Sequence, residues 1–113
     1  MPSSTFEISS MEELDLLLTS TNSPLVMYFY ADWCTPCELM SPSIEEFTED
    51  FDDMKFVKVN VELRKDIKSR YGIEIVPACV ILNQGEELYT FYGARKDALQ
   101  DVLSQIQLNY CYE

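Results

Sequence analysis

The chain has 113 residues, of which 20 are acidic and 8 are basic, for a formal net charge of -12. Hydrophobic residues make up 47% of it, enough to fill one core, and the length leaves no room for a second domain, so we expect a single domain over residues 1–113. The acidic balance argues against binding to nucleic acid or to an anionic membrane surface, because both require basic patches.

The first half of the chain predicts two helices with a buried strand between them. Ser10 and Glu13 have the spacing of a capping box before an apolar pattern of helical period, which predicts a helix over about 10–20. The unbroken apolar and aromatic run at 25–31 predicts a strand that is buried on both faces. Apolar residues then recur at spacings of three and four over 37–51, which predicts a long amphipathic helix kinked at Pro42.

The second half predicts three further strands, at 55–61, 76–82 and 87–92. Leu63, Ile67 and Tyr71 line one face of a predicted short helix that Gly72 ends. The polar segment 83–86 predicts a hairpin connection, and apolar spacing from Leu99 to Ile106 predicts a last helix. With a weak first strand, the order β-α-β-α-β-α-β-β-α predicts an α/β fold with a mixed sheet covered by helices on both faces.

Cys34 and Cys37 lie three residues apart at a predicted turn from strand to helix, where their side chains can form a disulfide. Cys34 lies at the start of the helix, where unpaired N–H groups and the helix dipole favour a thiolate, whereas Cys37 faces the core. We therefore expect Cys34 to attack a substrate disulfide and Cys37 to resolve the mixed disulfide, with no organic cofactor. Trp33 is expected to cover one side of the pair, and Pro36 to stiffen the turn.

Other roles for the cysteines fit the sequence less well. A zinc site has no histidine to use and would need both Cys79 and Cys111, so we expect no metal. A purely structural disulfide between Cys34 and Cys37 would close too short a loop to stabilise much. Cys79 is expected to be a small buried hydrophobic residue, with a regulatory thiol as the alternative. The chain is expected to be a monomer, although the more exposed Cys111 offers a route to a disulfide-linked dimer.

From about Phe6 to Ile106 the chain resembles the thioredoxin family. Five markers carry the resemblance in the family's order: the segment 29–37 with its Cys-Thr-Pro-Cys motif, Pro42, the segment 58–62, the segment 71–77 and Gly93. The resemblance implies a thioredoxin fold with a central mixed five-stranded sheet and four helices. It also implies that Pro77 is cis and lies against the cysteine pair, that the backbone of Val76 binds an extended substrate, and that Gly93 lines the substrate groove.

Two residues near the cysteines depart from the family. Thr35 replaces the usual glycine, which is expected to shift the reduction potential. Tyr28 stands where the family has a buried aspartate that relays protons to the resolving cysteine, so Lys58, the usual neighbour of that aspartate, loses its partner. A phenol with a pKa near 10 is a poor base at neutral pH, so we expect catalysis that is slower or less responsive to pH than in an ordinary thioredoxin.

The predicted groove departs as well, because Glu74 and Ile75 replace a more open and often basic pair. Together with Asp32 and Glu38, Glu74 forms an acidic rim that is expected to disfavour acidic substrates. The alternative is that these carboxylates are ordinary solvated surface charges.

The resemblance implies a thiol-disulfide oxidoreductase that reduces protein disulfides and is regenerated by a thioredoxin reductase using NADPH. Such a protein would serve electron transport and cell redox homeostasis. The first residues lack the charged start and apolar core of a secretory signal, so we expect it in the cytosol. The competing hypothesis is a thioredoxin-fold binding module with little redox activity. Tyr28, Thr35 and Ile75 favour the binding module, whereas the retained Cys34, Cys37, Trp33, Pro36 and Pro77 favour the enzyme.

Overall fold

The computed structural model describes residues 5–111. Its strands are β1 (Phe6–Glu7), β2 (Leu25–Tyr30), β3 (Lys55–Asn60), β4 (Ala78–Asn83) and β5 (Glu86–Tyr92). Its helices are α1 (Met11–Ser20), α2 (Thr35–Asp50), α3 (Lys65–Arg70) and α4 (Lys96–Tyr110). This order of elements is the one predicted from the sequence. None of the helices within 5–111 is both long enough and apolar enough to cross a lipid bilayer.

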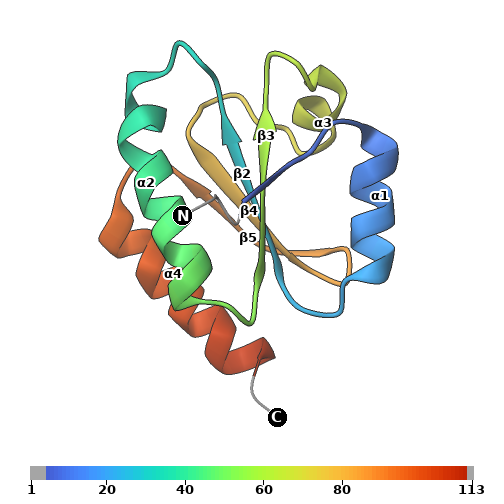
Figure 1. Cartoon of the computed structure of the whole chain (residues 1–113), viewed down its shortest axis with the longest axis vertical. Helices are drawn as coiled ribbons and strands as arrows, with labels where there is room; N and C mark the ends of the chain where they lie inside the picture. Colours follow the sequence, from blue (N-terminus) through green and yellow to red (C-terminus); the bar gives the residue numbers. More distant parts are fainter. Residues whose placement is uncertain (1–4, 112–113) are drawn as a thin grey trace.

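The strands form one mixed sheet in the order β1-β3-β2-β4-β5. Strands β1, β3 and β2 are parallel, whereas β4 runs antiparallel to β2 and β5 antiparallel to β4. Helices α1 and α3 cover one face of the sheet, and α2 and α4 cover the other (Figure 1). The fold class predicted from the sequence is confirmed, and β2 lies at the centre of the sheet.

Strand β2 is buried on both faces, as its unbroken apolar sequence predicts. Alternate side chains along a strand point to opposite faces, so Met27 and Phe29 pack with Leu14 of α1 and Ile67 of α3. Val26 and Tyr28 point to the other face of the sheet. There they pack in a second core with residues of α2 and α4, which include Met40, Ile44, Phe47, Leu99, Leu103 and Ile106. Packing on both faces therefore fixes the position of β2 and of the segment that follows it and leads to Cys34.

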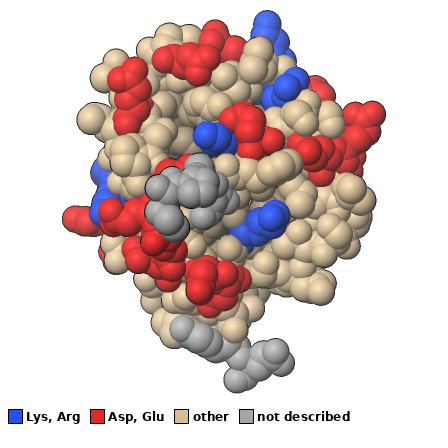
Figure 2. Space-filling model, viewed as in Figure 1, with Lys and Arg blue, Asp and Glu red and all other residues tan. Residues whose placement is uncertain are grey.

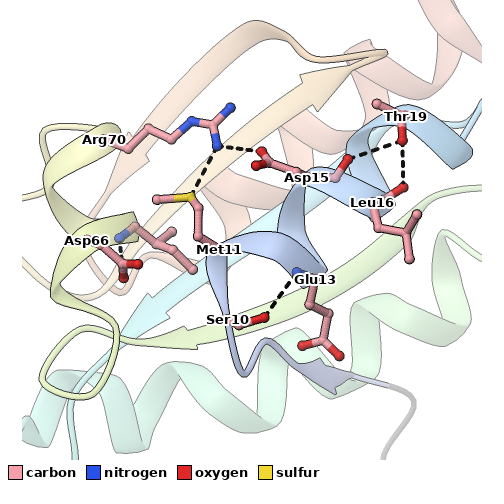
Figure 3. A network of polar contacts seen from close by, with 9 residues as sticks. Ser10, Met11, Glu13, Asp15, Leu16, Thr19, Asp66 and Arg70 are labelled. Atoms are coloured by element: carbon pink, nitrogen blue, oxygen red, sulfur yellow. Dashed lines mark hydrogen bonds and ion pairs between the residues drawn. The ribbon is translucent and has the colours of Figure 1, made fainter.

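Helix α1 begins with the predicted cap and is tied to α3. The Oγ atom of Ser10 accepts a hydrogen bond from the N–H of Glu13 at 3.1 Å (Figure 3). The Glu13 carboxylate turns to Ser9, which offers both its N–H and its hydroxyl, at 2.6 and 2.9 Å, so the second half of the predicted capping box is displaced by one residue. Arg70 at the end of α3 pairs with Asp15 of α1 at 2.7 Å (Figure 3).

The prediction that Leu63 lies on the third helix is wrong. Helix α3 starts at Lys65, and Leu63 is 67% exposed. The reason is a turn held by the buried side chain of Asn60, whose Oδ1 accepts hydrogen bonds from the N–H groups of Glu62 and Leu63. The helix ends before Gly72, which has a φ of +64° as its predicted terminating role requires.

The hairpin between β4 and β5 is tighter than predicted. Asn83 pairs with Glu86, which leaves only Gln84 and Gly85 in the turn. Both have positive φ, 52° and 86°, as a two-residue turn matched to the twist of the strands requires. Strand β5 therefore starts at Glu86 rather than at residue 87.

Candidate dithiol-disulfide site

Cys34 and Cys37 form a disulfide at the junction of β2 and α2. Their Cα atoms are 5.2 Å apart, and Cys34 is the N-cap of α2 while Cys37 lies in its first turn. Thr35 and Pro36 occupy the first two helical positions, where a proline costs no hydrogen bond because the N–H has no helical acceptor there. The local sequence thus begins α2 directly after Cys34 and before Cys37.

The two cysteines are similarly buried, but their sulfur atoms receive different hydrogen bonds. Cys34 is 3% exposed and Cys37 is 2% exposed, so exposure does not distinguish them. The backbone N–H of Cys37 donates to Sγ of Cys34 at 3.2 Å. In the reduced form this donor, together with the positive end of the α2 dipole, favours the thiolate at Cys34.

Two distant segments meet the cysteine pair. The peptide bond between Val76 and Pro77 is cis, as predicted, and Sγ of Cys34 lies 3.7 Å from the carbonyl oxygen of Val76. The N–H of Gly93 donates to the carbonyl oxygen of Pro77 at 2.9 Å, and Gly93 has a φ of +102°, which glycine adopts readily. The predicted groove residues Val76, Pro77 and Gly93 are therefore brought together with Cys34.

Tyr28 lies beneath Cys37. Its Oη atom donates to the carbonyl oxygen of Cys37 at 3.0 Å and lies 3.3 Å from Oγ of Ser41, which also donates to that carbonyl at 2.9 Å. Burial raises the pKa of Tyr28 above its ordinary value, so this phenol is a hydrogen-bond donor at neutral pH. The sequence reading missed Ser41, although its spacing of four from Cys37 places both on one helix face.

The family model for thioredoxin matches residues 5–105 of the chain. This protein belongs to the thioredoxin family. It is 42% identical to a thioredoxin of Mycoplasmoides gallisepticum over 79 residues, which cover 70% of this chain and 78% of that protein. The crystal structure of a thioredoxin from Nicotiana alata has a TM-score of 0.86 and 30% identity, and the match covers 93% of this chain and 94% of that one.

A third relative is much longer. A peptide-N(4)-(N-acetyl-beta-glucosaminyl)asparagine amidase of Caenorhabditis elegans is 31% identical over 101 residues, which cover 88% of this chain. This chain spans only 17% of the length of that amidase. Membership of the thioredoxin family and the close pair Cys34 and Cys37 indicate thiol-disulfide oxidoreductase chemistry.

The remaining predicted residues of the thioredoxin site lie at or outside its rim. Trp33 is 67% exposed, and Pro36, which follows Thr35 in the chain, is exposed as well. Lys58 lies on β3 opposite Tyr28, and its Nζ atom is 6.0 Å from the centre of the Tyr30 ring. The ammonium group of Lys58 therefore lies over the aromatic ring of Tyr30. Trp33 and Pro36, in contrast, are accessible to a partner.

Exposed acidic and apolar residues lie near the cysteines and Val76 in the chain. Asp32, Glu38 and Glu74 are exposed, as the predicted acidic rim requires. Ile75 is 64% exposed, like Trp33 before the first cysteine. On the face shown in Figure 2, acidic side chains are widespread and basic ones are few and separate, in keeping with the net charge of -12.

The other two cysteines are not part of the dithiol. Cys79 on β4 is buried as predicted, and desolvation raises the pKa of its thiol to about 12. Cys111 is half-buried after α4, where its Sγ donates to the carbonyl oxygen of Asp53 at 3.9 Å, and burial is the main cause of its raised pKa. Among residues 5–111 no group of three or more histidine, cysteine or acidic residues could hold a metal ion.

Proposed function

We propose that the protein reduces disulfide bonds of protein substrates, with Cys34 as the attacking residue and Cys37 as the resolving one. The observation that carries this proposal is the hydrogen bond from the N–H of Cys37 to Sγ of Cys34. It gives Cys34 a stabilised negative charge in the reduced form, and Cys37 receives no equivalent donor among the described residues.

In the proposed cycle, the Cys34 thiolate attacks one sulfur of the substrate disulfide, and the other substrate sulfur leaves as a thiolate. Cys37 loses its proton to solvent and attacks Sγ of Cys34, which expels the second substrate sulfur. The substrate gains two electrons and two protons, and the protein leaves the cycle as the Cys34–Cys37 disulfide. A thioredoxin reductase using NADPH would return the protein to the dithiol, so no bound cofactor is needed.

An extended substrate segment would lie along Val76, whose carbonyl oxygen is adjacent to Cys34. The backbone of Val76, on the other side of the cis bond from Pro77, is suited to binding such a segment because it precedes β4, which begins only at Ala78. The exposed side chains of Trp33 and Ile75 would contact apolar substrate residues on either side. The exposed carboxylates nearby favour substrates that carry basic residues.

A binding module with little redox activity is the second candidate. It is favoured by Ile75, which presents a large apolar side chain beside the cysteines, and by Tyr28, which offers no base to Cys37. In that case Trp33 and Ile75 would form a docking surface, and the state of the cysteines would not matter for binding.

The test is insulin reduction with NADPH and a panel of thioredoxin reductases. We expect turnover with the unmodified chain and with Cys111→Ser, which leaves the dithiol intact, and none with Cys34→Ser. A Cys37→Ser variant should accumulate stable mixed disulfides with its substrates, because the resolving sulfur is gone. Equal rates for the unmodified chain and Cys34→Ser would contradict the reductase and favour the binding module.

A further inference from the structure

Two hydroxyl groups converge on the carbonyl oxygen of Cys37. Tyr28 reaches it from strand β2 at 3.0 Å, and Ser41 reaches it from the next turn of α2 at 2.9 Å. The two hydroxyl oxygens are 3.3 Å apart, which is also within hydrogen-bond distance. The three oxygen atoms therefore form one cluster that joins the centre of the sheet to the start of the helix. We call the hydroxyls of Tyr28 and Ser41 the hydroxyl clamp.

The clamp is built into the interior of the protein. Tyr28 is 2% exposed, and its ring is stacked on that of Tyr30 with centroids 5.8 Å apart. A buried hydroxyl almost always has a hydrogen-bond partner. Leaving it unpaired costs more free energy than a typical hydrogen bond contributes to the stability of the fold. The partner of Tyr28 is the main chain of a redox-active residue, so its hydroxyl contributes at the site as well as to the core.

Cys37 is the residue whose position decides the second half of the proposed cycle. Its sulfur must approach Sγ of Cys34 in line with the bond that breaks, and small displacements from such a geometry cost a large part of the rate. The clamp binds the main chain of Cys37 at its carbonyl oxygen. The stabilising donor of Cys34 is a different group, the N–H of Cys37.

We propose that Tyr28 and Ser41 are positioning residues that hold Cys37 for the resolving step. This inference rests on the proposed function. In that step the Cys37 thiolate bonds to Sγ of Cys34, the bond from Cys34 to the substrate sulfur breaks, and the substrate leaves with the electron pair as a thiolate. Tyr28 and Ser41 gain and lose no proton. Loss of either hydroxyl slows resolution and leaves the attack by Cys34 unchanged.

The experiment separates attack from resolution. The reduced protein is mixed rapidly with one equivalent of dithiobis(nitrobenzoate), which releases one coloured thiolate on attack and a second on resolution. Every variant also carries Cys111→Ser, so that the half-exposed thiol does not react. The test variants are Tyr28→Phe and Ser41→Ala. The matched control is Tyr30→Phe, because the hydroxyl of Tyr30 donates to Glu7 and not to Cys37.

We expect the second release to be about fivefold slower in Tyr28→Phe and in Ser41→Ala, which corresponds to about 1 kcal/mol for one hydrogen bond. The first release should change by less than about twofold. Ser41→Thr keeps a hydroxyl and should restore the second rate, and Tyr30→Phe should match the parent that carries Cys111→Ser alone. An unchanged second release, an equal slowing of both releases, or a slow second release in Tyr30→Phe would each overturn the proposal.

Two further measurements keep the interpretation clear. Tyr28→Phe retains the ring that fills the core, and thermal unfolding checks that it folds; if it does not, Ser41→Ala and Ser41→Thr carry the test. The insulin assay is run on the unmodified chain in parallel. If insulin is not reduced but the second release still depends on the clamp, the proposed function fails and the role of Tyr28 and Ser41 stands. If insulin is reduced and the clamp has no effect, only the present inference fails.

Discussion

The Sγ atom of Cys34 lies 3.7 Å from the carbonyl oxygen of Val76, although 42 residues separate them in the chain. The contact joins the start of α2 to the segment that enters β4. A substrate sulfur that reaches Cys34 therefore comes close to the backbone of Val76. Trp33 precedes Cys34 in the chain and Ile75 precedes Val76, and both side chains are exposed. This arrangement, together with the two cores behind it, leads to four predictions.

The first prediction concerns the order in which the thiols react. In the reduced protein at neutral pH, limiting iodoacetamide should modify Cys34 first, because its sulfur accepts the N–H of Cys37 and the thiolate is the nucleophile. Cys79 should stay unmodified, because it is buried and burial raises its pKa. Peptide mapping by mass spectrometry measures the order. Modification of Cys37 as fast as Cys34 would contradict the assigned roles.

The second prediction concerns the charge of the substrate. Two disulfide-linked peptides that differ only in flanking lysine or glutamate residues should differ in kcat/KM by about threefold or more in favour of lysine at low salt. The difference should shrink at high salt, since exposed charges are screened. Glu74→Lys should reduce the preference. Glu49→Lys at the far end of α2 is the control, and an equal effect there would show that net charge alone decides.

The third prediction concerns stability at high pH. The Cys79 thiol has a pKa of about 12 in the folded protein, against an ordinary value of 9.0. A raised folded pKa contributes stability that is complete below the unfolded pKa and is lost as pH rises toward the folded value. Between pH 7 and pH 10 the free energy of unfolding of the oxidised protein, measured by urea unfolding, should fall. The fall should be larger than that of Cys79→Ala by about 1 kcal/mol or more. In a Cys111→Ala control, the fall in the free energy of unfolding should be closer to that of the unmodified chain than the fall in Cys79→Ala is. Equal falls with and without the Cys79 thiol would refute the prediction.

The fourth prediction compares two leucines on α4. Leu103 is fully buried against the sheet, so Leu103→Ala should lower the free energy of unfolding by about 2 to 5 kcal/mol through lost burial and a cavity. Leu108 is 58% exposed, so Leu108→Ala should change the free energy by less than about 0.5 kcal/mol. Chemical denaturation of both variants in the oxidised state makes the comparison. Similar costs at the two positions would mean that α4 packs differently.

Local patterns predicted most of the elements. Local sequence patterns predicted three features directly, because each depends only on neighbouring residues: the apolar run of β2, the helical spacing in α2 and the cap at Ser10. The errors fell at ends that depend on contacts with other segments. Asn60 delays the start of α3 through a buried turn, and the pairing of Asn83 with Glu86 shortens the hairpin.

The sequence by itself determined the pair Cys34 and Cys37 and their inequality, because a disulfide between residues three apart at a helix start follows from helix geometry and the free N–H groups there. Only the tertiary structure decided what surrounds them. The carbonyl of Val76 beside Cys34, the N–H of Gly93 on Pro77 and the two hydroxyls on Cys37 depend on which strands pair and which helix packs on them. Long-range pairing places such groups, and no local period in the chain encodes it.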